Sequence, residues 1–338
     1  MGIVFDSHRT RSRGAGRYLE GAETTESPPV AYCFVSRQLP GPALGRLAER
    51  HDVEIWPSRL PPSHEELTEQ VEPAEGLLSM LTDRVDAELI AAAPRLRAIS
   101  NYAVGHDNID LEAAAARDIP VGNTPGVLTD ATADLAFALL MAAARKLPEA
   151  DAAVREGDWK TWEPERYLGA DVHGATLGII GFGRIGQAVA ERAQGFGMTI
   201  LHTTRSSTAE DLDDVLRQCD FVSLHVPLTP ATHQLIDAHA LAQMKSSAIV
   251  INTARGELVD QKALTRALQD KLIAGAALDV TVPEPLPADD PLLTAPNLIV
   301  TPHIGSATQT ARERMADLAV DNLLAALDGR PMPHQVRP

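Results

Sequence analysis

The sequence predicts an α/β protein that carries parallel sheets in two domains. The chain has 338 residues, which exceeds the size of about 250–300 residues at which a single hydrophobic core stops growing. Short β-branched segments alternate with segments of helical periodicity, and this alternation occurs in two separate series. An apolar fraction of 44% with 22% charged residues is typical of a globular protein.

The first series starts at Val30 and predicts the first sheet. Its expected strands are 30–35, 53–56, 76–80, 96–100 and 119–121, and its expected helices are 42–50, 65–71, 85–93 and 111–117. Because a helix follows each strand, the strands should run parallel and the helices should cover the sheet.

A long helix separates the two series. Gly122 to Gly126 forms a turn-rich break, and Thr129 and Asp130 are expected to cap a helix that continues to about Lys146. Because this helix is apolar on most of its faces, it should be buried, either between the domains or at a dimer interface. It is one reason to expect a homodimer.

The second series predicts a complete second domain. Its expected strands are 176–180, 199–203, 221–226, 248–254, 274–280 and 297–303, and a helix from Ser306 to Leu327 follows, ending before Gly329. Since this helix stands apart from the second series, the chain should return to its first domain. The expected domains are therefore 29–127 with 304–338, and 128–303, with a ligand site in the cleft between them.

Residues 1–28 differ in composition from the rest of the chain. They contain several arginines and lack the apolar region of a secretory signal, which excludes one. An organellar transit peptide is an alternative, but the composition favours a disordered tail or an upstream start codon.

Charge and cysteine content exclude several classes of function. The formal net charge of −16 argues against a nucleic-acid partner, because phosphates require a basic face. The longest apolar stretch is shorter than the roughly 20 residues of a membrane span. Cys33 and Cys219 fit neither a disulfide framework nor a metal-ligand spacing, so we expect no metal site and a reducing, cytoplasmic location.

A glycine-rich segment predicts a dinucleotide site. The expected strand 176–180 runs directly into Gly181-Phe182-Gly183-Arg184-Ile185-Gly186 and a helix, which is the context that a GxGxxG motif requires. Gly181 would permit the tight turn, Gly183 would let the backbone approach a pyrophosphate, and Gly186 would let helix and strand pack closely. The start of the helix, at Arg184 and Ile185, would offer amides and a positive dipole to the phosphates.

The end of the next expected strand bears on the choice of cofactor. NAD-specific sites place an acid there, whereas this chain has Arg205, Ser206 and Ser207, which could bind a 2′-phosphate. NADP(H) is therefore the predicted cofactor. NAD(H) remains the alternative if Arg205 is only a solvated loop residue.

Three residues follow successive expected strands, where such sheets bind their ligands: Arg255, Glu284 and His303. Singly, they could be a surface ion pair, a solvated acid and a loop histidine. Together they suit the reduction of a keto acid, because arginine can bind its carboxylate and polarise its carbonyl. Histidine can give a proton to the alkoxide that hydride addition leaves, and a carboxylate can orient the ring and stabilise the imidazolium.

Six ordered segments resemble the D-2-hydroxyacid dehydrogenase family, and most closely its glyoxylate/hydroxypyruvate reductase branch. They are NYAVGHDNID, NTPGVLTDATADLA, LGIIGFGRIGQA, INTARGELVD, ALDVTVPEPLP and TPHIGSAT. The resemblance implies two Rossmann-like domains, the cofactor domain being inserted into a flavodoxin-like substrate-binding domain. It also implies NAD(P)H-dependent reduction of glyoxylate or hydroxypyruvate to the D-2-hydroxy acid.

The resemblance further implies roles for single residues. It makes Arg255 the substrate-binding arginine and His303 the proton donor, paired with Glu284. The other residues that it assigns are the amides of Val104 and Gly105 on the substrate carboxylate, Asp279 and Thr253 beside the nicotinamide, Pro227 in the nucleotide pocket, Gly305 and Ser306 beside the histidine, and Trp162 reaching into the partner's active site. A core or loop-packing role is the alternative for Trp162.

One departure from the family lies between Arg205 and Asp220, where the chain is shorter than the resemblance implies and is expected to lack a segment that forms a helix and a strand. An edge strand of the cofactor sheet is therefore expected to be absent. The preferred keto acid also stays open, because the sequence does not size the pocket around Leu78, Ser79 and Met80.

Three other functions are alternatives for a chain with this pattern. A formate dehydrogenase needs no Glu–His proton donor, so Glu284 counts against it. Many phosphoglycerate dehydrogenases extend into regulatory domains, whereas this sequence ends just after its final expected helix. A nicotinamide-sensing binding protein, such as a corepressor of this fold, could keep the three residues, and it remains the alternative from a different class.

Overall fold

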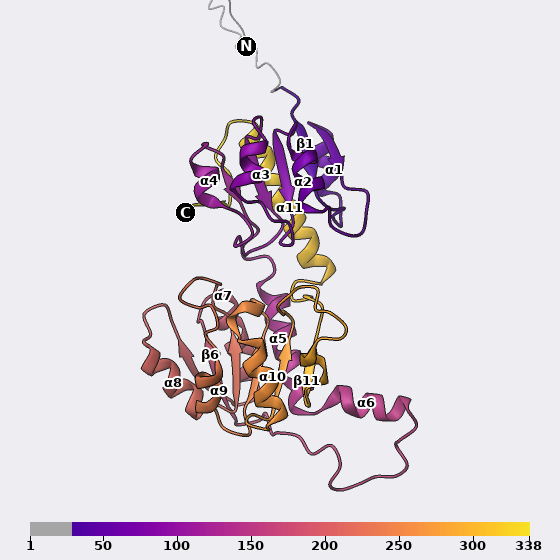
Figure 1. Ribbon diagram of the computed structural model, residues 1–338, viewed down its shortest axis with the longest axis vertical. Coiled ribbons are helices and arrows are strands. Elements are labelled where there is room, and N and C mark those ends of the chain that lie inside the picture. The colour runs from indigo at the N-terminus through magenta and orange to yellow at the C-terminus, as the bar shows by residue number, and fades with distance from the viewer. Residues whose placement is uncertain (1–28) are drawn as a thin grey trace, which may run out of the picture.

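The computed structural model describes residues 29–338 and contains two α/β domains (Figure 1). The expectation of a disordered tail at residues 1–28 lies outside the described residues. We call the domain that holds both ends of the described chain the terminal domain, and the other the central domain. The chain enters the central domain before α5 (Thr129–Ala144) and returns before α11 (Gln309–Leu327).

The terminal domain is a six-stranded sheet in the order β12-β5-β4-β3-β1-β2. All neighbouring strands are parallel except β12 with β5. The strands are β1 (Tyr32–Val35), β2 (Asp52–Ile55), β3 (Gly76–Ser79), β4 (Ala98–Asn101), β5 (Val121–Gly122) and β12 (Gln335–Val336). The helices are α1 (Ala43–Ala48), α2 (His64–Val71), α3 (Ala87–Ala92), α4 (Leu111–Ala115) and α11.

The central domain is a second six-stranded sheet, β11-β10-β9-β8-β6-β7, and it is parallel throughout. The strands are β6 (Thr176–Ile180), β7 (Thr199–Thr203), β8 (Phe221–Leu224), β9 (Ile249–Asn252), β10 (Gly275–Leu278) and β11 (Leu298–Val300). The helices are α5, α6 (Leu147–Arg155), α7 (Arg184–Gln194), α8 (Ala209–Gln218), α9 (Ala238–Gln243) and α10 (Gln261–Gln269), with 3-10 turns at Gly256–Leu258 and Pro291–Thr294. The predicted α/β class with two parallel sheets is confirmed.

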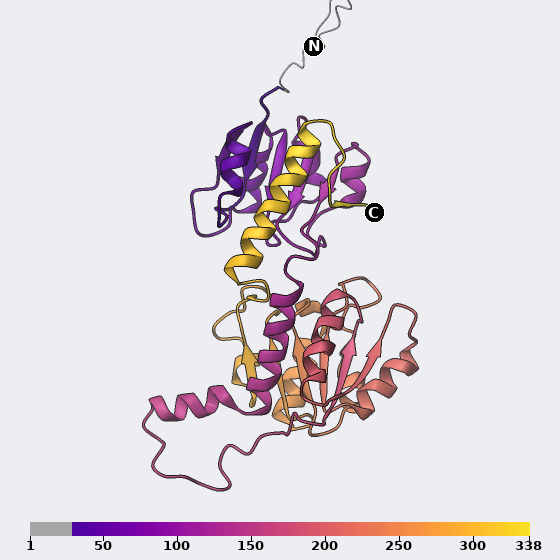
Figure 2. The same cartoon turned by 180° about the vertical axis from the view of Figure 1, so that it is seen from behind.

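Each sheet carries an apolar core on both of its faces. In the terminal domain, α11 lies across one face and buries Met315, Ala319 and Leu323 (Figure 2). The opposite face packs against α2 and α3 through Leu67 and Leu89. Because both faces are covered, inner strands such as β3 and β8 are buried along their whole length, whereas the edge strands β2 and β7 are partly exposed.

The helix that joins the domains, α5, packs mainly on the central domain. It buries Ala133, Ala136 and Leu140 against α7, β9, β10 and β11. Its acids Asp130 and Asp134 face outward and pair with Arg192 of α7, which is why an apolar helix carries them. An interface between two copies of the chain stays a prediction.

Three local expectations need correction. The prediction that Thr129 and Asp130 cap α5 is wrong, because the helix starts at Thr129 after Leu128 and has no side-chain cap. The last helix starts at Gln309 rather than Ser306, because the Thr308 hydroxyl accepts the amide of Ala311 there. After β7 no strand occurs before β8, as expected, whereas a helix, α8, is present.

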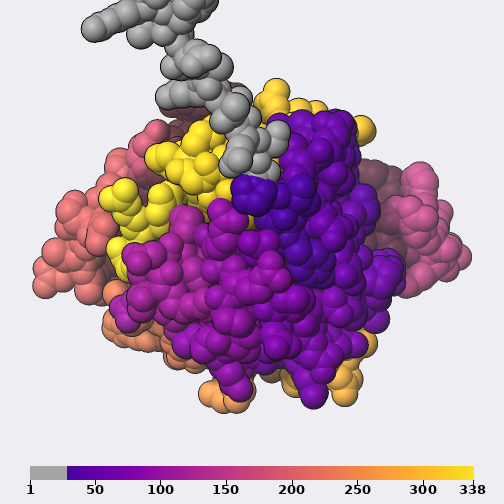
Figure 3. All heavy atoms as spheres, turned by 90° about the horizontal axis from the view of Figure 1, so that it is seen from above, coloured from indigo at the N-terminus to yellow at the C-terminus, as the bar shows by residue number. Residues whose placement is uncertain are grey.

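An arm projects from the central domain. It consists of α6 and the loop that follows it to Ala175, and it extends sideways past the terminal domain when the molecule is viewed from above (Figures 1 and 3). Trp159, Trp162 and Leu168 are exposed on it. Within residues 29–338, no helix is long and apolar enough to cross a membrane.

Candidate active site

The residues singled out by sequence lie in the cleft where the loops after the strands of both sheets meet. Two adjoining hollows occupy it, of about 430 and 1040 Å³. The smaller one is lined by Gly105, Arg255 and Pro227, the larger one by Glu284, and His303 lines both.

His303 and Glu284 form a hydrogen-bonded pair. The Nδ1 atom of His303 lies 2.9 Å from Oε2 of Glu284. The other carboxylate oxygen, Oε1, accepts the amide of Thr281 at 3.0 Å, which fixes the plane of the carboxylate. With Nδ1 committed to Glu284, Nε2 is the ring nitrogen left for a ligand.

Charge favours the ionised state of Glu284. Burial by itself would raise the pKa of this carboxyl, but the hydrogen bond and charge of His303, the Thr281 amide and nearby Arg255 together hold its pKa below the ordinary value. Burial lowers the pKa of a second histidine in the cleft, His225, to about 4, so that ring is neutral near pH 7. His303 differs from His225 in having a carboxylate, that of Glu284, as its hydrogen-bond partner.

Asp279 holds His303 in an unfavourable backbone conformation. His303 has φ +53°, in the left-handed region that side chains other than glycine rarely adopt. The buried Asp279 carboxylate accepts the amides of Ile304 at 2.8 Å and Gly305 at 2.7 Å, and its backbone carbonyl accepts the amide of His303 at 2.9 Å. These bonds stabilise the turn that aims the imidazole.

Arg255 makes an ion pair with Asp107 across the cleft. Its Nε lies 3.1 Å from both Asp107 oxygens, and its Nη2 lies 3.0 Å from Oδ1. Nη1 donates to the carbonyl of Ala254 at 2.8 Å. Since a guanidinium has five N–H groups, one on Nη1 and one on Nη2 stay available to a ligand while the other bonds fix its plane.

The ion pair also affects Asp107. Burial would raise the pKa of this carboxyl, but the hydrogen bonds and charge of Arg255 hold its pKa below the ordinary value. Asp107 was missed by the sequence analysis, although it lies inside the segment NYAVGHDNID. In the sequence, only its position two residues after Gly105 indicates a role for Asp107, and this position does not predict Arg255 as its partner.

Backbone contacts hold the Arg255 loop. The side chain of Asn252, which is buried at the end of β9, donates to the carbonyl of Arg255 at 2.7 Å and accepts the amide of Ala254 at 3.0 Å. A Cβ on Gly256 would lie 2.2 Å from the carbonyl oxygen of Thr281, so only glycine lets this loop pass so close to the one carrying Glu284.

The loop of Val104 and Gly105 faces Arg255. Asn101 donates to the carbonyl of Gly105 at 2.9 Å and Asn123 donates to that of Val104 at 2.8 Å, so both carbonyls have a side-chain donor. Within residues 29–338, neither Val104 nor Gly105 uses its amide in a hydrogen bond. Two adjacent donors are therefore available beside the guanidinium, as a carboxylate would require.

The glycine-rich turn fits a dinucleotide. Gly181 has φ +97°, and a Cβ on Gly186 would lie 2.2 Å from the carbonyl oxygen of Gly181, so both positions require glycine. A Cβ on Gly183 would meet nothing within 4 Å, which leaves open space where the backbone would approach a pyrophosphate. The hydroxyl of Thr253, which lines the smaller hollow, is buried without a partner among the described residues and offers a contact to a bound group.

The segment after β7 is exposed at the sheet edge. Ser206 and Ser207 bond within the turn, since Ser206 Oγ lies 2.9 Å from Thr204 Oγ1 and Ser207 Oγ accepts the Thr204 amide at 3.0 Å. The guanidinium of Arg205 has no hydrogen bond within the described part of the chain. Arg205 is thus the group of this segment that is free to meet a 2′-phosphate.

The other predicted site residues divide between the cleft and the surface. Ile185, Gly305 and Ser306 line the smaller hollow with Pro227. Arg184 is exposed at the start of α7, and Trp162, which is 80% exposed on the arm, does not line the cleft of its own chain.

The predicted substrate pocket is shifted along the chain. Leu78 and Ser79 are buried within β3, whereas Met80 and Leu81 line the larger hollow. The inclusion of Leu78 and Ser79 in this pocket is therefore wrong. Both side chains are fully buried in the terminal domain and do not reach the hollow.

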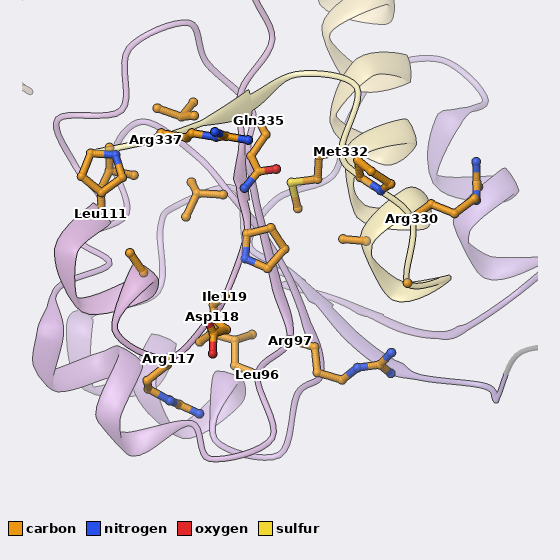
Figure 4. A pocket seen from close by; sticks show the side chains of 18 residues that line it. Leu96, Arg97, Leu111, Arg117, Asp118, Ile119, Arg330, Met332, Gln335 and Arg337 are labelled. Atoms are coloured by element: carbon orange, nitrogen blue, oxygen red, sulfur yellow. The ribbon is translucent and has the colours of Figure 1, made fainter.

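A third hollow, of about 760 Å³, lies beside β12 in the terminal domain (Figure 4). Gln335 and Arg337 extend over it, whereas Arg97 and Arg330 point away. Asp118 is its only acidic residue, and no histidine lines it. It therefore lacks the acid–base pair that the cleft contains.

Comparisons with known proteins agree on one family. Residues 137–305 match the model described as D-isomer specific 2-hydroxyacid dehydrogenase, NAD binding domain. The chain is 50% identical to a glyoxylate reductase of Korarchaeum cryptofilum (strain OPF8), over 90% of this chain and 95% of that protein.

Solved structures agree in fold. A protein of Thermus thermophilus matches with a TM-score of 0.86 and 51% identity, over 90% of this chain and 99% of that one. An NADPH-dependent glyoxylate/hydroxypyruvate reductase of Sinorhizobium meliloti, in complex with NADP and malonate, matches with a TM-score of 0.80 and 33% identity, over 92% of this chain and 97% of that one.

Proposed function

The chain belongs to the D-isomer specific 2-hydroxyacid dehydrogenase family, and we propose that it reduces glyoxylate or hydroxypyruvate to the D-2-hydroxy acid with a reduced nicotinamide cofactor. The observation that carries this proposal is the pair of His303 and Glu284, 2.9 Å apart, in the same cleft as Arg255. A proton donor and a carboxylate-binding cation are the two groups that keto-acid reduction asks of a protein.

The residues of this chain would share the work as follows. The two remaining N–H groups of Arg255, with the amides of Val104 and Gly105, would bind the substrate carboxylate and orient its carbonyl. The turn of Gly181, Gly183 and Gly186 would hold the pyrophosphate of a reduced nicotinamide dinucleotide, which when bound would supply the hydride for the carbonyl carbon. His303 would then give the proton on Nε2 to the alkoxide oxygen, and the ionised Glu284 would stabilise the imidazolium before this transfer.

Asp107 and Asp279 would act through these groups rather than on the substrate. Asp107 holds the plane of the Arg255 guanidinium, and Asp279 holds the turn that carries His303. We treat both as positioning residues, and the implied contact of Asp279 with the nicotinamide stays a proposal. Asp279 uses both carboxylate oxygens on the turn that follows β11.

NADP(H) is the cofactor that we propose as preferred, with NAD(H) as the alternative. Arg205 is unpaired among the described residues, and no acid stands at the end of β7 to repel a 2′-phosphate. The Sinorhizobium meliloti relative is NADPH-dependent, which supports the same choice.

We further propose that the protein is a homodimer in which the arm places Trp162 in the active site of the partner. The support is the exposure of three large apolar side chains, Trp159, Trp162 and Leu168, on the projecting arm, because groups of exposed apolar side chains mark interaction sites. Cys33 and Cys219 are buried and unbridged, as expected in the reducing cytoplasm that we propose as its location.

The test is oxidation of NADPH and NADH, in parallel, with glyoxylate, hydroxypyruvate and pyruvate. We expect turnover with glyoxylate or hydroxypyruvate that is lost in His303→Ala, while NADPH still binds. Binding of cofactor without turnover of any of the three keto acids would instead favour a nicotinamide-sensing protein.

A further inference from the structure

The larger hollow of the cleft exceeds what a two-carbon substrate needs. It measures about 1040 Å³ and begins at His303 and Glu284, so it is continuous with the site described above. Glyoxylate, with five heavy atoms, fills on the order of 100 Å³ if each atom takes somewhat less room than a water molecule. A two-carbon substrate therefore leaves most of the space beyond His303 in a single chain unfilled.

Three arginines line this space away from the acid–base pair: Arg37 after β1, Arg59 after β2, and Arg312 in α11. None of them forms an ion pair within residues 29–338. The chain as a whole has 46 acidic and 30 basic residues, so arginines without acidic partners are not expected to gather by chance.

The acidic residues near these arginines form their hydrogen bonds with other groups. Both oxygens of Asp279 bond the turn after β11, and Glu284 bonds His303 and the amide of Thr281. The buried Asp83, which Arg37 influences electrostatically, uses its carboxylate on the Ser36 hydroxyl and on the amide of Met80 at 2.7 Å. Among the described residues, no carboxylate forms a hydrogen bond with any of the three arginines.

Local contacts hold these arginines in place. Trp56 Nε1 donates to the carbonyl of Leu60 at 3.0 Å, which closes the loop that carries Arg59. The Tyr102 hydroxyl donates to the carbonyl of Arg312 at 2.7 Å, and Arg312 Nε donates to the Ser306 carbonyl at 3.3 Å. Arg37 Nη1 donates to the Ser36 carbonyl at 2.6 Å. Most N–H groups of the three guanidinium groups remain available.

The order of the strands gives the length of a ligand that would reach from the loop of Val104 and Gly105 to Arg37 and Arg59. Val104 and Gly105 follow β4, whereas Arg37 and Arg59 follow β1 and β2, which lie two and three strands away in the sheet. At about 4.8 Å per strand this is a separation of roughly 10–14 Å. The arginine side chains cover a large part of it, which leaves room for a substrate about as long as a four- or five-carbon acid.

We propose that Arg37, Arg59 and Arg312 form a distal anion subsite, and that the enzyme reduces 2-keto acids that carry a second anionic group, a carboxylate or a phosphate. This inference rests on the proposed keto-acid reduction. One anionic end binds Arg255 and the amides of Val104 and Gly105, and the other binds the distal arginines, whose planar N–H groups match both carboxylate and phosphate.

The test compares pairs of substrates that differ in the distal charge. Oxaloacetate is paired with 2-oxobutanoate, 2-oxoglutarate with 2-oxopentanoate, and 3-phosphohydroxypyruvate with hydroxypyruvate. We expect kcat/KM to be about tenfold or more higher for the charged member of at least one pair, mainly through a lower KM. The first two pairs report on a carboxylate and the third on a phosphate.

Variants assign the effect to the arginines. Arg59→Leu and Arg37→Leu should each reduce, several-fold, the ratio of kcat/KM for the charged substrate to kcat/KM for the uncharged one. The reduction should come mainly from a higher KM for the charged substrate. Arg314→Leu is the matched control, because Arg314 is an exposed arginine on the same helix as Arg312 and lines neither hollow of the cleft. Arg59 is exposed on a loop, so Arg59→Leu should fold even if Arg37→Leu does not.

The outcomes separate this inference from the function on which it rests. Turnover of glyoxylate without preference for any charged member, or a preference that Arg59→Leu leaves intact, would overturn the distal subsite alone. Absence of turnover with every keto acid would overturn the proposed function as well.

Discussion

Replacing Glu284 with glutamine tests the proton donor directly. In the structure Oε1 accepts the Thr281 amide and Oε2 faces His303 Nδ1 at 2.9 Å. A glutamine can keep the first bond through its carbonyl oxygen and then presents its NH₂ group to Nδ1. This arrangement disfavours the imidazolium, because both facing groups would be donors.

The magnitude follows from the bond that is lost. Side-chain exposures of 24% for His303 and 29% for Glu284 leave the pair largely shielded from water. A hydrogen bond to a charged group is worth about 1.5–3 kcal/mol, which corresponds to about one to two pH units at 1.36 kcal/mol per unit. The basic limb of the pH profile of kcat/KM should therefore move down by about one to two units.

The assay is keto-acid-dependent NADPH oxidation over the range of about pH 5.5 to 9. We expect Glu284→Gln to be about 10- to 100-fold slower in kcat/KM near pH 8 and much closer to the unmodified protein near pH 5.5. Glu210→Gln, an exposed glutamate of α8, is the matched control. An unchanged rate with an unchanged pH profile would refute the assignment of the pair as proton donor.

The remaining predictions concern the groups around this pair. In Gly105→Ala the new Cβ would lie 1.7 Å from Arg255 Nη2, so KM for the keto acid should rise about tenfold or more while NADPH affinity is kept; Gly45→Ala, where nothing lies within 4 Å, is the control, and equal KM values would contradict the role of Arg255. Gly186→Ala should lower the free energy of unfolding by about 1–3 kcal/mol, which a thermal melt would show. Gly183→Ala should weaken only NADPH binding, which a titration would show. Equal melting temperatures for the two variants would argue against the packing role of Gly186. Because the pKa of Asp107 is lowered in the folded protein, its ion pair stabilises the fold above the ordinary Asp value of about 3.9 and is lost as the pH falls through the lowered value. Asp107→Asn should therefore lower Tm near pH 7 and have less effect near pH 3, and a difference that grows toward low pH would rule this out.

Local sequence patterns were sufficient for the order and type of most elements. The run 176–180 followed by Gly181, Gly183 and Gly186 is a strand, a tight turn and a helix, because each step depends on neighbouring residues alone. The helix starts were predicted less well: α5 has no side-chain cap, and α11 begins three residues later than expected. Several neighbouring residues can serve as the N-cap of a helix, and tertiary packing decides which of them does.

The sequence by itself thus determined the fold class and the family, and it named Arg255, Glu284 and His303 as candidates for a common site. Only the tertiary structure decided which residues hold them, Asp107 on Arg255 and Asp279 on the turn of His303, and that Arg37 and Arg59 line the far end of the cleft. The physical reason is that these contacts join residues from different loops and domains. They depend on strand order and on how the two sheets face each other, which hydrophobic periodicity and turn chemistry do not encode.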